Sequence, residues 1–224
     1  ISFFLHFKAV QLTSSRPGPK NLKTLGGNCF RCSSLNGHGS LNMIEAIKHS
    51  CNSYIYGIAM KTGVDKIIEV AQKFGFGTHT KIDLPGELAG FLPTPKWKKK
   101  QYGNRWTMGD TLNLSIGQGF ILATPMQLVR LMSAIASNGK LFVPQIAMNI
   151  PEYTQINISQ EHLDIVKTAL YNTINSSGGT GYFNRINYKS MRMAGKTGTA
   201  QVRAKKGAHD NLNRKDIDWN YRNH

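Results

Sequence analysis

The sequence predicts a mostly helical chain with very little sheet and one strand close to its C-terminal end. Three observations lead to this expectation. Helix start and stop signals follow one another between residues 41 and 174, and long polar connections interrupt them. Only the segment 191–202 has a convincing strand pattern. With 224 residues, the chain is long enough for one sizeable hydrophobic core.

Apolar residues at helical spacing mark the first helices. Leu41, Ile44 and Ile47 recur at intervals of three, which predicts a helix over 41–47. Two further helices are predicted over 53–61 and 65–74. Gly63 and Gly75 follow these segments, and glycine is the residue that most often ends a helix.

The clearest helix start is the run Thr124-Pro125-Met126-Gln127. Thr124 can cap the helix, Pro125 suits its first position, and Gln127 can complete a capping box. We expect this helix to run to about residue 137 and to stop at Gly139. Ser159 caps a further predicted helix, whose apolar face consists of Leu163, Val166, Leu170 and Ile174.

Two polar stretches rich in glycine and proline, 75–110 and 176–188, are predicted to be long connections. Within the first, Glu87 and Asp110 are expected to orient loops rather than to act as acid and base. Aromatic side chains in and just after it either line a substrate groove or pack the connection, and the sequence does not decide between these two readings. These are Trp97, Tyr102, Trp106 and Phe120.

The formal net charge is +16, from 28 Lys and Arg against 12 Asp and Glu. Such a charge fits a nucleic acid, an anionic membrane or a wall surface. Only residues 98–100 form a run of lysines, and no arginine-rich arm is present, which disfavours nucleic acid. No apolar run is long enough to span a membrane, and the first residues make a poor signal peptide.

The three cysteines and His38 raise the question of a metal. Cys29 and Cys32 form a Cys-x-x-Cys pair, but no second pair of Cys or His lies at metal-ligand spacing. We therefore predict no metal and no cofactor, and treat Cys51 as a residue without a function of its own. His38 lies between two glycines with no visible partner, which favours a structural turn.

Two short motifs carry candidate chemistry. In a strand containing Lys196-Thr197-Gly198-Thr199, alternate side chains share a face, and Gly198 would let an extended peptide approach the backbone. Ser50 and Asn52 can face one site only if the helix breaks between them, which is plausible because Asn52 or Ser53 can cap the next helix.

Ser-x-Asn and Lys-Thr-Gly are two of the three motifs of the penicillin-recognising serine enzymes. The chain also contains Gly117-Gln118-Gly119, a Thr-Pro-Met-Gln-Leu segment from residue 124, and Ile-Asp-Leu-Pro-Gly-Glu from residue 82. The ordered set resembles the class B penicillin-binding proteins. Gly37-His38-Gly39 and the segment 106–110 resemble their penicillin-binding protein 2 group, the transpeptidases of cell elongation. The resemblance covers about 29–202 and resumes at 219–224.

This resemblance implies an incomplete α/β transpeptidase fold, made of the helical subdomain and one strand of the antiparallel sheet. Residues 1–28 match poorly, and 29–224 would form a partial transpeptidase domain. The resemblance also implies roles for single residues. Ser50, Asn52 and Lys196 would be catalytic, with Lys196 acting electrostatically and in proton transfer beside Ser50. Thr197, Gly198 and Thr199 would bind substrate, and the two threonines would hold a terminal carboxylate.

The implied function is cross-linking of peptidoglycan stem peptides ending in D-Ala-D-Ala, with β-lactams as inhibitors and cell-elongation proteins as partners, on the periplasmic face of the inner membrane. The family's nucleophile lies in a Ser-x-x-Lys motif ahead of Ser50. The one literal match, Ser137-Asn138-Gly139-Lys140, follows Ser50 and is predicted to be a helix end, as is a second Lys-Thr-Gly at 61–63. We therefore expect this chain to be inactive alone.

Alternatives to a transpeptidase fragment remain. One is a noncatalytic cell-wall-binding or scaffold module that uses the basic surface. A nucleic-acid-binding protein and a β-lactamase relative are the others. The Gly-Gln-Gly and Thr-Pro-Met-Gln-Leu segments favour the transpeptidases over the β-lactamases.

Overall fold

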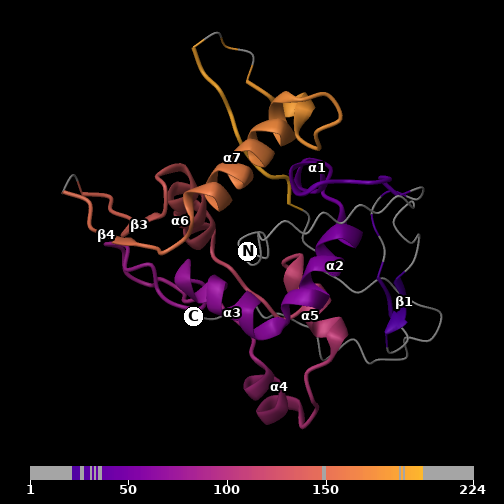
Figure 1. The fold of residues 1–224 in the computed structure, drawn as a ribbon. Coiled ribbons are helices and arrows are strands. Elements are labelled where there is room, and N and C mark those ends of the chain that lie inside the picture. Colours follow the sequence, from indigo (N-terminus) through magenta and orange to yellow (C-terminus); the bar gives the residue numbers. More distant parts are fainter. Residues whose placement is uncertain are drawn as a thin grey trace, which may run out of the picture.

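The computed structural model describes residues 22–25, 28–30, 32, 34, 37–147, 150–186, 188 and 190–198. Helices are the main regular structure of this part of the chain, and its strands form two separate antiparallel pairs, β1 with β2 and β3 with β4 (Figure 1). The elements in chain order are β1 (Leu22–Leu25), β2 (Asn28–Phe30), α1 (Met43–Lys48), α2 (Asn52–Thr62), α3 (Val64–Lys73), α4 (Pro95–Tyr102), α5 (Met108–Ser115), α6 (Pro125–Ala136), β3 (Lys140–Phe142), β4 (Tyr153–Gln155), α7 (Gln160–Asn175) and the 3-10 helix η2 (Tyr182–Asn184).

One apolar core is shared by α2, α3, α5, α6 and α7, and it has almost fully buried side chains such as Phe74, Leu112 and Leu163 at its centre. The whole predicted apolar face of α7 is buried. α1 packs along α7, α2 packs on α5, and β3 packs on α6. Because α1 and α7 lie side by side near the top of Figure 1, the end of α1 is held close to the segment that follows α7.

Helix starts follow the predicted capping chemistry. The capping box of Thr124 and Gln127 is present, with Pro125 at the first position of α6. Ser159 caps α7 by accepting a hydrogen bond from the backbone N–H of His162. α1 begins two residues later than predicted, because the side chain of Asn42 caps it. Among the described residues, no helix is both long and apolar enough to cross a membrane.

The predicted connection 75–110 is wrong in part, because it contains α4 and the start of α5. Thr94 caps α4 and is followed by Pro95, and Thr107 forms a capping box with Asp110 at the start of α5. These are the same signals that identify α6. They were outweighed by the polar composition of the stretch, and α4 has no buried residue that would produce an apolar pattern.

The predicted strand over 191–202 is also wrong for its described part, since 191–198 form no strand there. A strand needs a paired neighbour, and this segment bonds to α7 instead. The backbone N–H of Gly195 donates to the carbonyl oxygen of Leu170 (3.2 Å), and the Asn175 amide donates to the carbonyl oxygen of Met193 (2.7 Å). Residues 199–202 lie outside the described residues.

Candidate active site

The turn that joins α1 to α2 carries Ser50. The backbone N–H of Ser50 donates to the carbonyl oxygen of Ile47 (3.1 Å), and that of Cys51 donates to the carbonyl oxygen of Ala46 (2.9 Å). These two bonds close a helix through one left-handed residue, usually glycine. Ser50 takes that place with a φ of 52°. A side chain in this conformation is strained, and such strain gathers at functional sites. The predicted break between the two helices is confirmed.

Lys196 reaches this turn from a segment 146 residues further along the chain. Its amine Nζ donates hydrogen bonds to Ser50 Oγ and to the carbonyl oxygen of Thr197, the latter at 3.1 Å. Both side chains are half-buried. Burial lowers the pKa of Lys196, because a charged amine is poorly solvated there. A lysine of lowered pKa beside a hydroxyl is suited to proton transfer.

Thr197 and Gly198 are exposed beside Lys196. The hydroxyl of Thr197 is 2.8 Å from that of Thr180, and it also lies 3.4 Å from Lys196 Nζ. A Cβ built on Gly198 would meet no atom within 4 Å, so the space beside this backbone is open. The exposed hydroxyl and the open backbone leave room for an extended ligand. Thr180 was not singled out from the sequence, and its Gly-Gly-Thr-Gly context was the available signal.

The other two predicted site residues are placed less fully. Asn52 is half-buried at the first position of α2, two residues after Ser50. The placement of its side chain relative to Lys196 remains a prediction. Thr199 lies outside the described residues, so its predicted role as a carboxylate and oxyanion donor also remains a prediction.

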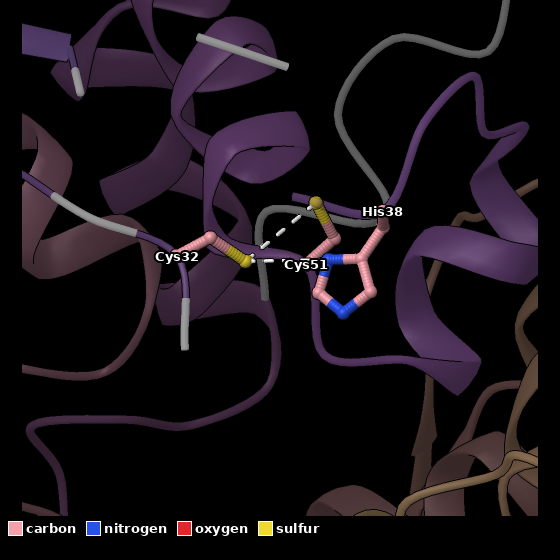
Figure 2. Close-up of side chains that lie close together, drawn as sticks. All are labelled: Cys32, His38 and Cys51. Carbon is pink, nitrogen blue, oxygen red and sulfur yellow. Dashed lines mark hydrogen bonds between the residues drawn. The ribbon is translucent and has the colours of Figure 1, made fainter. Parts of the chain in front are cut away.

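A second cluster of side chains includes Cys51, the residue that follows Ser50. Cys32 Sγ is 3.4 Å from His38 Nδ1 and 4.0 Å from Cys51 Sγ, and the three ligand atoms lie within 4.8 Å of one another (Figure 2). The His38 ring also stacks on that of His49, with centroids 5.7 Å apart. The expectation that His38 has no partner is therefore wrong. Sequence spacing missed the cluster because the α1–α2 turn supplies Cys51, 19 residues after Cys32.

The thiols of this cluster differ in their electrostatics. Burial raises the pKa of Cys51 to about 11. Burial also acts to raise the pKa of Cys32, but backbone N–H groups of Ser34, Asn52 and Ser53 point at its sulfur, and the pKa falls below its ordinary value. Burial and the neighbouring His49 lower the pKa of His38. Thiolate sulfur and neutral imidazole nitrogen are the ligands that Zn²⁺ prefers.

The sequence profile of the penicillin binding protein transpeptidase domain matches residues 21–220. The chain belongs to this family. It is 35% identical to the peptidoglycan D,D-transpeptidase MrdA of Acinetobacter baumannii over 214 residues, covering 89% of this chain and 31% of the relative. The MrdA protein of Salmonella typhimurium is 35% identical over 181 residues, covering 74% and 29%. The chain thus spans about a third of the length of these relatives.

Solved structures agree. Penicillin-binding protein 2 from Helicobacter pylori superposes with a TM-score of 0.81 at 34% identity, over 90% of this chain and 38% of that one. The complex of that protein with MreC gives a TM-score of 0.75 at 34% identity, over 82% and 35%. The described helices and their order are therefore those of a partial penicillin-binding transpeptidase domain.

Two further sequence matches to the family's motifs, at 61–63 and 137–140, are helix ends and not parts of the site, as predicted. They are called the decoy motifs below. Lys61 and Thr62 close α2, and Gly63 caps its end with a φ of 80°. Ser137 caps the end of α6, and Lys140 opens β3, so Ser137 does not head a helix. Of the two Lys-Thr-Gly runs in the chain, only the second contacts Ser50.

The aromatic side chains of the first connection pack mainly on one another. Trp97 makes edge contacts with Phe91, Tyr102 and Phe120 at centroid distances of 4.6 to 5.6 Å. Trp106 donates from its ring nitrogen to the Thr111 hydroxyl. These contacts favour packing over a substrate groove.

Glu87 and Asp110 orient loops, as predicted. Glu87 accepts hydrogen bonds from the backbone of Thr80 and Lys81. Asp110 accepts from Lys98 Nζ at 2.5 Å and from the backbone N–H of Thr107 at 2.7 Å. Both carboxylates are therefore committed to holding neighbouring backbone in place.

Proposed function

We propose that this chain is the part of a peptidoglycan D,D-transpeptidase that holds the donor peptide and carries the second and third motifs of the active site. The observation that carries the proposal is the hydrogen bond from Lys196 Nζ to Ser50 Oγ. The two residues belong to separate motifs, and the turn that presents Ser50 is strained. Relatives that are 35% identical to this chain over the aligned residues are named for the same activity.

In the proposed reaction, the nucleophile is the serine of the family's Ser-x-x-Lys motif and not Ser50. Its hydroxyl attacks the carbonyl carbon between the two D-alanines. The amide C–N bond breaks, D-alanine leaves as an amine that takes the serine proton, and an ester forms. An acceptor amine then attacks this ester, forms the cross-link amide and returns a proton to the serine. Lys196 would stabilise negative charge and, through Ser50, relay the proton. Asn52 would bind the donor backbone, and Thr197 and Thr199 its carboxylate.

The partners and location of the whole protein are part of this proposal. Penicillin-binding protein 2 of Helicobacter pylori has been solved with MreC, which supports cell-elongation proteins as partners. Peptidoglycan stem peptides and β-lactams are the proposed ligands. The periplasmic face of the inner membrane is the proposed location, because that is where peptidoglycan is cross-linked.

A binding measurement with a matched decoy tests the proposal. An N-acylated peptide ending in D-Ala-D-Ala is titrated into the 224-residue chain by calorimetry, beside the same peptide with its C-terminal carboxylate replaced by an amide. We expect binding of the carboxylate peptide only, weakened roughly tenfold or more by Lys196→Met, since hydrogen bonds to charged groups contribute about 1.5 to 3 kcal/mol. Lys61→Met, in the decoy motif, should bind like the wild type. Equal effects of the two variants would reject the site.

A noncatalytic wall-binding module is the second candidate. It is favoured by the net charge of +16 and by the exposed lysines Lys96, Lys99 and Lys100 on α4. A pulldown with purified cell wall over a series of salt concentrations tests it. Retention that is lost in a variant with these three lysines changed to glutamine, yet unchanged in Lys196→Met, would support this candidate over peptide recognition.

We further infer that Cys32, His38 and Cys51 bind a soft divalent cation such as Zn²⁺. Two sulfurs and one imidazole nitrogen already lie within 4.8 Å of one another, and a tetrahedral ion would leave one position for water or another ligand. Cys51 lies between Ser50 and Asn52, so such an ion would also brace the Ser-x-Asn turn.

Cobalt substitution tests this site, because thiolate-bound Co²⁺ absorbs strongly in the near ultraviolet. The wild-type chain should bind one Co²⁺, and Zn²⁺ should displace it. Cys32→Ser and Cys51→Ser should each lose the thiolate band. His49→Ala removes a ring that stacks on His38 without joining the cluster, and it should keep the band. Binding that survives both cysteine substitutions would contradict the assignment.

A further inference from the structure

The loop that follows α7 contacts both parts of the candidate active site, which are the turn that carries Ser50 and the Lys-Thr-Gly segment. Its residues 178–181, here the glycine loop, read Gly-Gly-Thr-Gly. The backbone N–H of Gly181 donates to the carbonyl oxygen of Thr173 (3.0 Å), near the end of α7. A Cβ on Gly179 would lie 2.3 Å from that same oxygen, so only glycine fits there. The glycine loop is thus pressed against the end of α7.

Thr180 makes the two contacts that matter for the site. Its backbone N–H donates to the carbonyl oxygen of Lys48 (3.2 Å), the last residue of α1 and two positions before Ser50. Its side-chain oxygen lies 2.8 Å from Thr197 Oγ1. One residue therefore joins the end of α1 to the Lys-Thr-Gly segment. A Cβ on Gly178 would lie 3.3 Å from the ring of His49, which places the loop against the same turn.

The contact between the two threonine hydroxyls can have either direction, and the hydrogen-bond inventory shows what each direction means for Thr197. A hydroxyl offers one proton and accepts through two lone pairs, whereas the Lys196 ammonium can only donate. Lys196 Nζ lies 3.4 Å from Thr197 Oγ1. If Thr180 also donates, both lone pairs of Thr197 Oγ1 are occupied, and its own proton is left for an outside acceptor. If Thr197 donates to Thr180 instead, the Thr197 proton is not available to a ligand.

We propose that Thr180 is a positioning residue that donates to Thr197 and so directs the Thr197 proton toward the terminal carboxylate of the bound peptide. This inference rests on the proposed function, and it adds a residue that lies outside the two motifs. Thr180 acts through Thr197 and also fixes the distance between the Lys-Thr-Gly segment and the turn of Ser50.

The test uses the full 224-residue chain with three substitutions. Thr180→Val keeps the shape and removes the hydroxyl, Thr180→Ser keeps the hydroxyl, and Thr154→Val is a matched control at an exposed threonine of β4. Binding of the acylated D-Ala-D-Ala peptide should weaken roughly five- to tenfold in Thr180→Val, as expected for one lost hydrogen bond of about 1 kcal/mol. Thr180→Ser should restore binding, and Thr154→Val should not change it.

A second readout needs no ligand. In methyl NMR spectra of chain labelled at threonine, Thr180→Val should shift the Thr197 signal, and Thr180→Ser should return it close to the wild-type position. A wild-type peptide affinity in Thr180→Val, or an unmoved Thr197 signal, would overturn the inference while leaving the proposed function intact. If the wild-type chain does not distinguish the carboxylate peptide from its amide, the proposed function fails, and the Thr197 signal still decides the contact between the threonines.

Discussion

Lys196 Nζ donates a hydrogen bond to Ser50 Oγ across 146 residues of sequence, and Ser50 holds a left-handed backbone conformation at that contact. The strained turn presents the Ser50 hydroxyl, and this hydroxyl accepts a hydrogen bond from the half-buried amine of Lys196. A glycine at position 50 would relax the turn, but it would leave the amine without this hydroxyl. A serine at this position therefore favours a role in the site over a role in stability.

The first prediction concerns this strain. Ser50→Ala removes the hydroxyl and keeps the Cβ, whereas Ser50→Gly removes both. Because a Cβ in a left-handed residue costs about 1 to 2 kcal/mol, Ser50→Gly should be about 1 kcal/mol more stable than Ser50→Ala in urea unfolding. Equal stability of the two variants would mean that the turn carries no strain.

The second prediction concerns the pH dependence of stability. Burial lowers the folded-state pKa of Lys196 below its ordinary value of 10.5. The unfolded chain therefore binds more protons between the two pKa values, and the contribution of Lys196 to stability rises with pH through that window. At neutral pH the charged, buried amine is a constant penalty.

The measurement compares the wild type with Lys196→Met. The free energy of unfolding of the wild type, relative to this variant, should increase as the pH approaches 10.5 from below. A difference that stays flat, or one that falls with pH, would show that burial does not depress this pKa. Lys61→Met again serves as the control, since the Lys61 side chain is exposed.

The third prediction concerns the segment 75–110, which was predicted to be a connection and in fact contains α4 and the start of α5. The Gln127 amide is almost fully buried and donates to the carbonyl oxygens of Thr78 and Ala89, each at 2.8 Å. Gln127→Ala would leave both oxygens without this donor, which should cost about 2 kcal/mol or more. Gln101→Ala, at an exposed position of α4, should change the free energy of unfolding by less than about 0.5 kcal/mol.

The fourth prediction concerns acylation. The chain contains no Ser-x-x-Lys ahead of Ser50, and Ser50 Oγ accepts from the Lys196 amine rather than donating to it. A hydroxyl without a base that takes its proton is a poor nucleophile near neutral pH. Fluorescent penicillin should therefore not label this chain covalently at pH 7. A penicillin adduct mapped by mass spectrometry to any serine would contradict this and identify the nucleophile.

The sequence predicted the parts of the fold that local chemistry determines. Thr124 and Ser159 cap their helices as expected, because an N-cap hydrogen bond joins residues that are three apart in the sequence. The resemblance to the class B penicillin-binding proteins implied the pairing of Ser50 with Lys196, and the structure places the two side chains in contact. α4 was missed because a helix with no buried residue produces no apolar periodicity.

The remaining errors share one cause, which is contact between distant segments. The strand expected over 191–202 needs a neighbour, and its described part bonds to α7 through Gly195 instead. The sulfurs of Cys32 and Cys51 meet only because the α1–α2 turn brings them together. Thr180 belongs to no recognised motif, and its importance follows from its contacts with Lys48 and Thr197.

The contact between Ser50 and Lys196 carries the whole proposal, and a double-mutant cycle tests it most directly. The free energy of unfolding is measured for the wild type, Ser50→Ala, Lys196→Met and the double variant. The account predicts a coupling energy of about 1 kcal/mol, the size of a hydrogen bond between neighbouring groups. Additive effects, with a coupling below about 0.3 kcal/mol, are expected of distant residues and would contradict the site.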